Sequence, residues 1–346
     1  LTGFGSLLVL LILAAMILAP QLIGLIAPGL TDPALKAKAI RMTRIVMPAQ
    51  FFFFTGGLFM AVQFAKERFA VPALAPLIYN LGIIAGGVLL GPRVGIEGFA
   101  WGALIGAMAG NCALQLLGAR RAGMVLRLRF DLRHPDLRTY ILVSLPLMVG
   151  LTMSFSTEFF LKYFGSYLPA GSIAALTYDL RIMFVLVGFF GQAVGTAAFP
   201  YMARLAAENR LAEMNRLLNT TLKYLAVVIP FSVLFMVLRN EVVMLLFQRG
   251  RFDAAATELT ARLLLFLMAG TVAFSAQSVI VRAYFAVQNT LFPSIFCSAG
   301  ALLSIPLYAY NMRLWGAAGI ASAISVSVIL QTWLLYALWN RRGQNT

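Results

Sequence analysis

The chain has 346 residues, of which 61% are hydrophobic and only 11% charged, with a mean hydropathy of +0.88. A soluble domain carries roughly a quarter charged residues, so this composition excludes an ordinary soluble protein and predicts an integral membrane protein. The net charge of +15 comes from Lys and Arg that lie mostly between apolar stretches. We therefore assign it to membrane topology and anionic lipid headgroups, and expect no nucleic acid as partner.

Apolar stretches long enough to cross a bilayer, which takes about 20 residues, follow one another along the whole chain. They predict an all-α integral membrane protein with about ten transmembrane helices, at roughly 4–27, 42–64, 72–91, 96–118, 139–163, 171–200, 220–247, 258–286, 291–311 and 315–339. The connections after the second, fourth, sixth and tenth helices carry more Lys and Arg than those on the other side. This bias predicts that they are cytoplasmic.

Distinctive residues recur along the chain at a fixed offset of 221 residues, which indicates an internal repeat. The recurring pairs are Gly29 and Gly250, Asp32 and Asp253, Arg41 and Arg262, Pro72 and Pro293, Gly98 and Gly319, and Arg120-Arg121 and Arg341-Arg342. The first four predicted helices therefore correspond to the last four. Six helices separate equivalent positions, so the two copies have the same orientation, as in a parallel repeat. We expect two lobes, of which the first lacks two N-terminal helices.

The repeat also predicts the boundaries of the lobes. We expect a partial N-lobe of four helices at 1–121, a cytoplasmic basic linker at 122–138, a C-lobe of six helices at 139–342 and a tail at 343–346. Apolar and basic residues alternate within the linker. This alternation suits either an interfacial segment whose apolar residues dip into lipid or a plain basic loop.

Arg181 is the first candidate for a functional side chain. It lies about ten residues, or roughly 15 Å, into an apolar helix, near the middle of the bilayer. An arginine there costs at least about 2.5 kcal/mol and rarely faces lipid. One interpretation is a structural ion pair with Asp179 or Glu158. The other is a cation that lines a central water-filled cavity and binds phosphate oxygens through its planar guanidinium.

Two carboxylates, Glu158 and Asp179, lie in the predicted helices 139–163 and 171–200. Glu158 is either the partner of Arg181 or a proton or sodium coupling site. Asp179 precedes Arg181 by two residues, so their side chains point about 200° apart on a helix and face different neighbours. No loop carries a nucleophile constellation, a paired acid–base site or a phosphate-binding glycine loop. We therefore expect no enzyme, and the sequence leaves a metal site open.

The repeated turns predict structural roles for Gly29, Asp32, Gly250 and Asp253. Each aspartate follows its glycine by three residues and precedes a predicted helix, whose N-terminus it can cap. Small-residue spacings predict close helix contacts at two other places, Gly102-xxx-Gly106-xxx-Gly110 and Gly191-xxx-Gly195.

Several segments carry a family resemblance. They are residues 27–29 (APG), 68–76 (RFAVPALAP) with Asn80, 194–200 (VGTAAFP), 246–261 (LFQRGRFDAAATELTA) and 282–290 (RAYFAVQNT). Together they make essentially the whole chain similar to the MurJ (MviN) family. The resemblance implies a flippase for lipid II, the undecaprenyl-pyrophosphate-linked peptidoglycan precursor, in the bacterial inner membrane. It also implies the two-lobe fold of the multidrug/oligosaccharidyl-lipid/polysaccharide (MOP) exporter superfamily.

The resemblance extends to single residues. Arg181 matches the family's cavity arginine within the pattern Tyr178-x-x-Arg181, while the other cavity arginines would lie in the two helices that the chain lacks. A carboxylate that some members use for sodium would fall near Leu161, and Asn289 stands where an Asp is common. Sodium or proton coupling therefore stays open.

The expected partners are lipid II and membrane lipids, with no cofactor and a monomeric protein. The expected mechanism is alternating access between two lobes, which the membrane potential can assist. A drug or cation antiporter of the same superfamily would instead need an acidic, aromatic cavity. A membrane glycosyltransferase would need Asp- or His-rich loops, and a structural scaffold would have no polar cavity.

Overall fold

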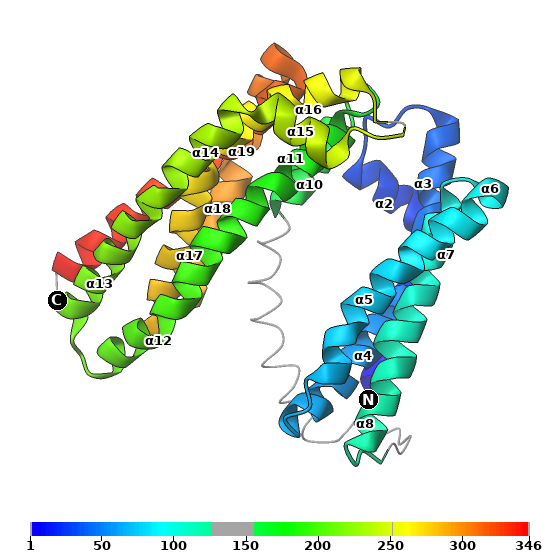
Figure 1. The fold of residues 1–346 in the computed structure, drawn as a ribbon, viewed down its shortest axis with the longest axis horizontal. Helices are drawn as coiled ribbons and strands as arrows, with labels where there is room; N and C mark the ends of the chain where they lie inside the picture. The colour runs from blue at the N-terminus through cyan, green and yellow to red at the C-terminus, as the bar shows by residue number, and fades with distance from the viewer. Residues whose placement is uncertain (1, 126–155, 251, 345–346) are drawn as a thin grey trace. The chain divides into compact units, whose positions relative to one another are not determined.

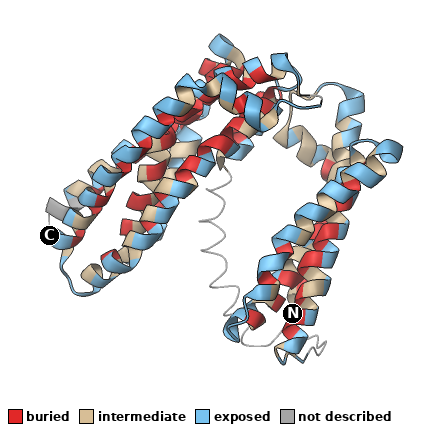
Figure 2. Cartoon of the chain, in the orientation of Figure 1, coloured by how far each residue is buried: buried red, intermediate tan, exposed pale blue. Residues whose placement is uncertain are grey.

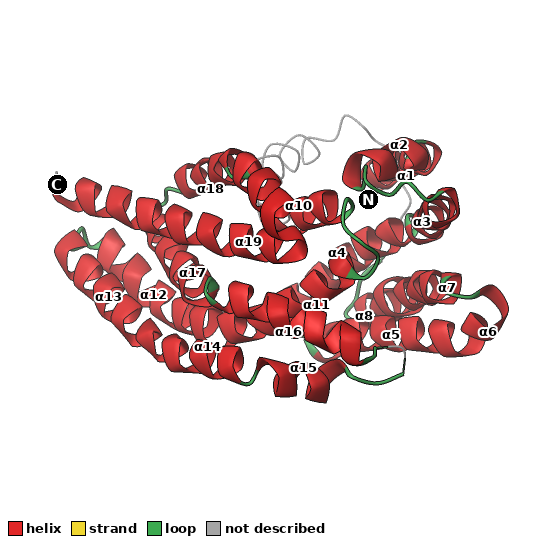
Figure 3. Cartoon of the chain, turned by 90° about the horizontal axis from the view of Figure 1, so that it is seen from above, coloured by secondary structure: helices red, strands yellow, loops and turns green. Residues whose placement is uncertain are grey.

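The computed structural model describes residues 2–125, 156–250 and 252–344, and every regular element among them is a helix (Figure 1, Figure 3). The chain divides into two compact units, Leu1–Leu142 (unit 1) and Val143–Thr346 (unit 2). Most of the predicted linker at 122–138 and the first part of the predicted helix at 139–163 lie outside the described residues.

The described residues include six helices long and apolar enough to cross a membrane, or up to eight if each of two bent pairs is one span. The chain is therefore an all-helical, multi-pass membrane protein, and the predicted number of about ten spans is not confirmed. Part of the difference between the predicted and observed numbers of spans arises because two predicted helices are joined in one helical run. The predicted helices 291–311 and 315–339 belong to one run, Leu291–Arg341. This run is interrupted at Ser304 and at Gly316, whose φ of 56° is not helical.

Unit 1 is a bundle of helices that expose many apolar side chains. In chain order it contains α1 (Thr2–Ile17), α2 (Ala19–Ile26), α3 (Pro33–Val46), α4 (Ala49–Ala65), α5 (Ala70–Ala85), α6 (Gly91–Val94), α7 (Glu97–Gly106) and α8 (Leu114–Arg121), with π-helical turns η1 at Gly86–Leu90 and η2 at Ala107–Ala113. Leu10 and Leu89 are among its exposed apolar residues. Exposed positions occur along all of its helices (Figure 2). A helix that is apolar on its outer face suits contact with lipid.

Glycines bring α5 and α7 into direct backbone contact. A Cβ atom at Gly102 would collide with the carbonyl oxygen of Gly82, and one at Gly106 would lie 2.8 Å from the carbonyl oxygen of Tyr79. Lipid supplies little hydrophobic driving force for helix association, so close packing of small residues has to supply it. The predicted small-residue face of Gly102 and Gly106 is therefore the surface on which α5 packs.

A buried pair of amides joins three other segments of unit 1. Gln63 on α4 donates from Nε2 to Oε1 of Gln115 on α8 at 3.0 Å, and Gln115 Nε2 donates to the carbonyl of Val71 on α5 at 3.1 Å. Both amides are almost completely buried. Hydrogen bonds between side chains inside membrane bundles contribute about 0.6 kcal/mol each, so this pair adds specificity to the packing of α4 and α8.

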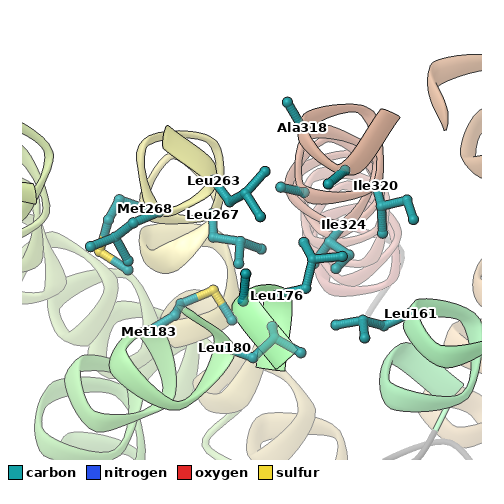
Figure 4. Packing of buried hydrophobic residues seen from close by; sticks show 14 of the residues in the cluster. Leu161, Leu176, Leu180, Met183, Leu263, Leu267, Met268, Ala318, Ile320 and Ile324 are labelled. Carbon is teal, nitrogen blue, oxygen red and sulfur yellow. The ribbon is translucent and has the colours of Figure 1, made fainter. Parts of the chain in front are cut away.

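Unit 2 contains the longer part of the described chain. In order it contains α10 (Ser156–Gly165), α11 (Ser172–Leu186), η3 (Val187–Gln192), α12 (Ala193–Ala207), α13 (Leu211–Tyr224), η4 (Leu225–Val227), α14 (Val228–Val237), α15 (Arg239–Phe247), α16 (Ala254–Met268), α17 (Thr271–Ala286), α18 (Leu291–Leu303) and α19 (Ile305–Gln344). One core cluster joins α10, α11, α16 and α19, with Leu161, Leu176, Leu267 and Ile324 among its members (Figure 4). A second joins α12, α13, α17 and α19.

The 221-residue repeat is visible in the backbone. Glu67 and Gln288 both have a positive φ, of 55° and 59°, and both lie just after a helix, α4 and α17 respectively. Gly95 and Gly316, separated by the same offset, have φ values of 66° and 56°. A left-handed conformation is uncommon for residues other than glycine, so its recurrence at Glu67 and Gln288 is a specific structural match. The corresponding turns of the two copies therefore have the same geometry.

We expect Gly102→Ala to destabilise the protein by ~1–3 kcal/mol, because the added methyl group has to displace the backbone of α5. The measurement is thermal unfolding of the purified protein in detergent. Gly57→Ala is the matched control, because Gly57 is an exposed helical glycine with nothing within 4 Å of an added Cβ. Its expected effect is between neutral and a gain of about 1 kcal/mol. Equal melting of the two variants would contradict the close approach of α5 and α7.

Candidate functional site

Arg181 lines a cavity of about 470 Å³ between α10 and α11, which we call the Arg181 cavity. Its lining consists of Glu158, Leu161, Lys162, Thr177, Leu180, Arg181, Phe184 and Val185. Two cations and one carboxylate thus face a space that is otherwise apolar apart from the hydroxyl of Thr177. Such a cavity has a positive balance of charge, which favours an anionic occupant.

Arg181 itself is exposed to this cavity and is not neutralised. It lies nine residues after Ser172, the first residue of α11, which places it about 14 Å along the helix. Within the described residues, no ion pair joins its guanidinium to a carboxylate. Arginines inside membrane proteins face the bundle interior or a water-filled cavity, and mark substrate or ion pathways. The cavity-lining interpretation therefore agrees with the geometry better than the structural ion pair does.

Glu158 is paired with a different residue from the one considered in the sequence. Lys162 Nζ lies 3.5 Å from Glu158 Oε2, one helical turn along α10, and the two side chains are 48% and 56% exposed respectively. Exposed i,i+4 pairs contribute only about 0.3–0.5 kcal/mol, so this pair can open at little cost. Lys162 was not singled out from the sequence, although its spacing of four residues from Glu158 is the signal that could have found it.

Asp179 is buried on the opposite side of α11. The residue is completely inaccessible, and neither carboxyl oxygen has a hydrogen-bond partner among the described residues. Its separation from Arg181 follows from helix geometry, which turns the two side chains about 200° apart. The neighbouring helix α16 carries Thr260, whose hydroxyl is also buried without a partner. A buried carboxyl without partners costs free energy, so Asp179 is a functional candidate and not a source of stability.

The repeated turns hold helices in the way their sequence predicts. Asp253 accepts a hydrogen bond from the backbone N–H of Ala256 at 2.9 Å and caps α16, while Asp32 caps α3 through Ala34 and Leu35. Gly250 has a φ of 62°, a conformation that favours glycine, whereas Gly29 is not left-handed. The two copies therefore share the cap but differ at the glycine.

An aromatic contact links this turn to the helix that carries Arg181. The ring of Tyr178 lies with its centroid 4.7 Å from that of Phe247 and 5.6 Å from that of Phe252. Phe247 and Phe252 flank the turn that precedes α16. Tyr178 thus fixes the first half of α11 against the turn, which positions Arg181 one helical turn further along.

Two arginines near the junction of α12 and α13 form ion pairs, in contrast to Arg181. Arg204, in the last turn of α12, donates from Nε to Glu208 at 2.9 Å, and Arg210, just before α13, bonds both Glu208 and Glu213. These two arginines hold the pKa of Glu208 below its ordinary value. These two arginines are neutralised by acids, whereas Arg181 pairs with no carboxylate among the described residues.

A second arginine of unit 2, Arg282, is the first residue of the family segment 282–290. Arg282 lies inside α17 and lines a separate cavity. The signal that could have found it is the one that identified Arg181, namely an arginine within an apolar span. Across the described segments, no group of three or more His, Cys, Asp or Glu side chains is arranged to hold a metal ion.

A family model described as lipid II flippase MurJ matches residues 1–346. A probable lipid II flippase MurJ of Bdellovibrio bacteriovorus is 27% identical over 317 residues, which cover 89% of this chain and 59% of the relative. The lipid II flippase MurJ of Burkholderia cenocepacia is 25% identical over 313 residues, which cover 88% of this chain and 60% of the relative. The chain thus spans about 60% of the length of these relatives.

Solved structures share the fold. A lipid II flippase MurJ in an inward closed conformation matches with a TM-score of 0.81 at 23% identity, covering 98% of this chain and 70% of that one. An inward-facing multidrug resistance MATE family transporter of the MOP superfamily matches with a TM-score of 0.81 at 14% identity, covering 99% and 80%. The fold is that of the MOP superfamily of membrane transporters. The chain belongs to the MurJ lipid II flippase family.

We expect Asp179→Leu to raise the free energy of unfolding by ~1–3 kcal/mol, because it replaces a buried carboxyl without partners by an apolar group of similar size. Thermal unfolding in detergent is the measurement. Glu158→Gln serves as the control, since a half-exposed carboxylate contributes little to stability. A lower melting temperature for Asp179→Leu would show that the carboxyl has a stabilising partner.

Proposed function

We propose that the protein transports lipid II across the bacterial inner membrane and is not an enzyme. Membership in the MurJ family and the names of the two relatives support the substrate. The observation that carries the proposal is Arg181, a cation without a carboxylate partner in a cavity of a membrane-spanning unit. A pyrophosphate group supplies the negative charge that this cavity lacks.

The mechanism follows from the chemistry of the substrate. The guanidinium of Arg181 binds pyrophosphate oxygens through its planar fork, and Lys162 adds a second positive charge at the same cavity. The polyprenyl tail stays in lipid, against the exposed apolar faces of the helices. About ten helices in two parallel-repeat lobes, rocking against each other as a monomer, would expose the headgroup alternately to the two sides.

The membrane potential favours outward movement of an anionic headgroup. Each negative charge that crosses an inside-negative potential gains roughly 2.3 kcal/mol per 100 mV. A bound cation can add to this driving force or reset the transporter. Asp179 is the group that we propose for coupling, because an ionised carboxylate buried without a partner is costly and a bound proton or sodium ion removes that cost.

Export of drugs in exchange for cations, the function of multidrug transporters with this fold, fits the site less well. Binding a cationic drug favours a cavity with excess negative charge, whereas the Arg181 cavity has two cations and one acid. Glu158, that one acid, is already within ion-pair distance of Lys162. The balance of charge therefore favours an anionic substrate.

Arg181→Ala should lower the rate of lipid II translocation at least tenfold in proteoliposomes that contain the full-length protein. Arg181→Lys should retain part of the rate, because it keeps the charge but loses the planar fork. Arg313→Gln is the matched control, since Arg313 is an exposed arginine on α19 outside the Arg181 cavity. Normal translocation by Arg181→Ala would remove Arg181 from the mechanism.

Asp179→Asn should abolish the dependence of lipid II translocation on imposed proton and sodium gradients. The amide carries no negative charge, so it neither binds a proton near neutral pH nor attracts a sodium ion as a carboxylate does. The same assay is applied to Glu158→Gln, which should keep the dependence because Lys162 already pairs with that carboxylate. If Asp179→Asn responds to both gradients as the unaltered protein does, coupling does not reside at Asp179.

A further inference from the structure

Unit 2 contains a second, larger cavity of about 550 Å³, which we call the Arg282 cavity. Side chains from α12, α17, α18 and α19 contribute to its wall, and these helices belong to one unit (Figure 1). Three carboxamides, Gln192, Gln277 and Gln331, line it together with the guanidinium of Arg282. No Asp or Glu is among the lining residues. The cavity is therefore cationic and carries polar groups on a wall that is otherwise largely apolar.

Arg282 is held in place entirely by neutral groups. One terminal nitrogen donates to Gln192 Oε1 at 2.6 Å and to Thr196 Oγ1 at 3.2 Å, and the other donates to the carbonyl of Ser278 at 3.2 Å. The guanidinium lies directly over Gly195, where a Cβ atom would collide with it. These contacts fix the orientation of the guanidinium but leave its charge uncompensated. An arginine carries five N–H donors, so some remain available to a ligand.

Carboxamides on α17 and α19 offer hydrogen-bond acceptors in the same cavity. Gln331 uses its Nε2 to donate to Ser327 Oγ at 2.8 Å, and Gln277 directs its Nε2 to Cys297 Sγ at 3.6 Å. With their NH₂ groups engaged, the two carboxamides present oxygens that accept no hydrogen bond from the described residues. The ring of Phe274 adds an apolar surface. Hydroxyl groups of a sugar match such acceptors, and a phosphate matches the guanidinium.

We propose that the Arg282 cavity binds a phosphorylated sugar, with the phosphate on Arg282 and the sugar hydroxyls on Gln277 and Gln331. A volume of about 550 Å³ exceeds what a phosphate ion needs and lies within the range of pockets for small organic ligands. The geometry of the cavity by itself defines an anionic ligand with hydroxyl groups. The assignment rests on the proposed function only for the identification of that ligand with the headgroup of lipid II.

The two cavities of unit 2 are adjacent along one helix. Phe184 lines both of them, and its ring meets that of Phe274 edge-on at 5.6 Å. Arg181 and Gln192, the partner of Arg282, lie eleven residues apart on the helical run Ser172–Ala207, a separation of roughly 15 Å. The Arg282 cavity is thus a candidate second anion-binding site, next to the Arg181 cavity and sharing Phe184 with it.

Cys297 gives the cavity a native reporter, because it lines the cavity and the chain has only one other cysteine, Cys112. The experiment measures the rate at which N-ethylmaleimide modifies Cys297 in the full-length protein, with Cys112 and any cysteine outside this sequence replaced by alanine, in phosphatidylcholine nanodiscs. The probes are N-acetylglucosamine 1-phosphate, inorganic phosphate and N-acetylglucosamine. We expect the sugar phosphate to slow modification at least fivefold, inorganic phosphate less, and the neutral sugar not at all.

Variants assign the protection to individual side chains. Arg282→Gln should abolish protection, Arg282→Lys should keep part of it, and Arg181→Gln should leave it intact. Gln331→Leu should weaken protection by the sugar phosphate but not by inorganic phosphate, because it removes an acceptor without touching Arg282. If the rate of Cys297 modification without any probe is unchanged, the variant keeps the cavity folded. If Arg282→Gln does not keep it folded, Arg282→Lys is used to test the role of Arg282.

Several results would overturn the assignment. The first is protection of Cys297 in Arg282→Gln that equals protection in the protein without this substitution. The second is loss of protection in Arg181→Gln but not in Arg282→Gln. The third is protection by N-acetylglucosamine that equals protection by N-acetylglucosamine 1-phosphate. Protection by phosphatidylglycerol added to the nanodiscs, with no further effect of the sugar phosphate, would instead identify a membrane lipid as the occupant. Protection that depends on Arg282, in a protein that does not translocate lipid II, would support the site and reject the proposed function. Translocation of lipid II without such protection would support the proposed function and reject the site.

Discussion

A charge inside a membrane protein must be compensated or hydrated, and this constraint organises unit 2. Hydrocarbon offers no partner to a guanidinium, so an arginine in an apolar helix must face another polar group or a water-filled space. Arg181 and Arg282 each line a cavity and neither pairs with a carboxylate among the described residues. Arg210, which precedes α13, binds two acids directly. Its charge is therefore neutralised within the protein, whereas Arg181 and Arg282 each present a charge that an anionic ligand can neutralise.

The sequence was sufficient for the membrane class and for the repeat, whereas a functional role for Arg181 stays a prediction. The offset of 221 residues, found from glycine, aspartate, arginine and proline matches, recurs in the left-handed residues Glu67 and Gln288. Helix periodicity also separated Asp179 from Arg181 correctly, because a spacing of two residues places side chains on different faces whatever the tertiary packing.

Other features depended on packing that no local pattern encodes. The sequence leaves the partner of Glu158 open between Arg181 and an ion, whereas the structure gives Lys162, four residues away on the same helix. Arg282 was overlooked because its cavity is lined by carboxamides from three separate segments, which only the tertiary fold brings together. The number of spans stays unconfirmed, because most of the predicted helix 139–163 lies outside the described residues and because the predicted helices 291–311 and 315–339 lie in one run with a break at Gly316.

The glycine contact between α5 and α7 also has a mechanical consequence. Where two backbones touch directly, no long side chains remain that can adopt new rotamers, so the pair resists bending and sliding as a stiff strut. Deformation of a helical protein then concentrates at places where the helix itself is interrupted. The 45° bend between α16 and α17 and the 71° bend between α1 and α2 are such places. Within the described residues, we therefore expect bending to occur mainly at these two breaks.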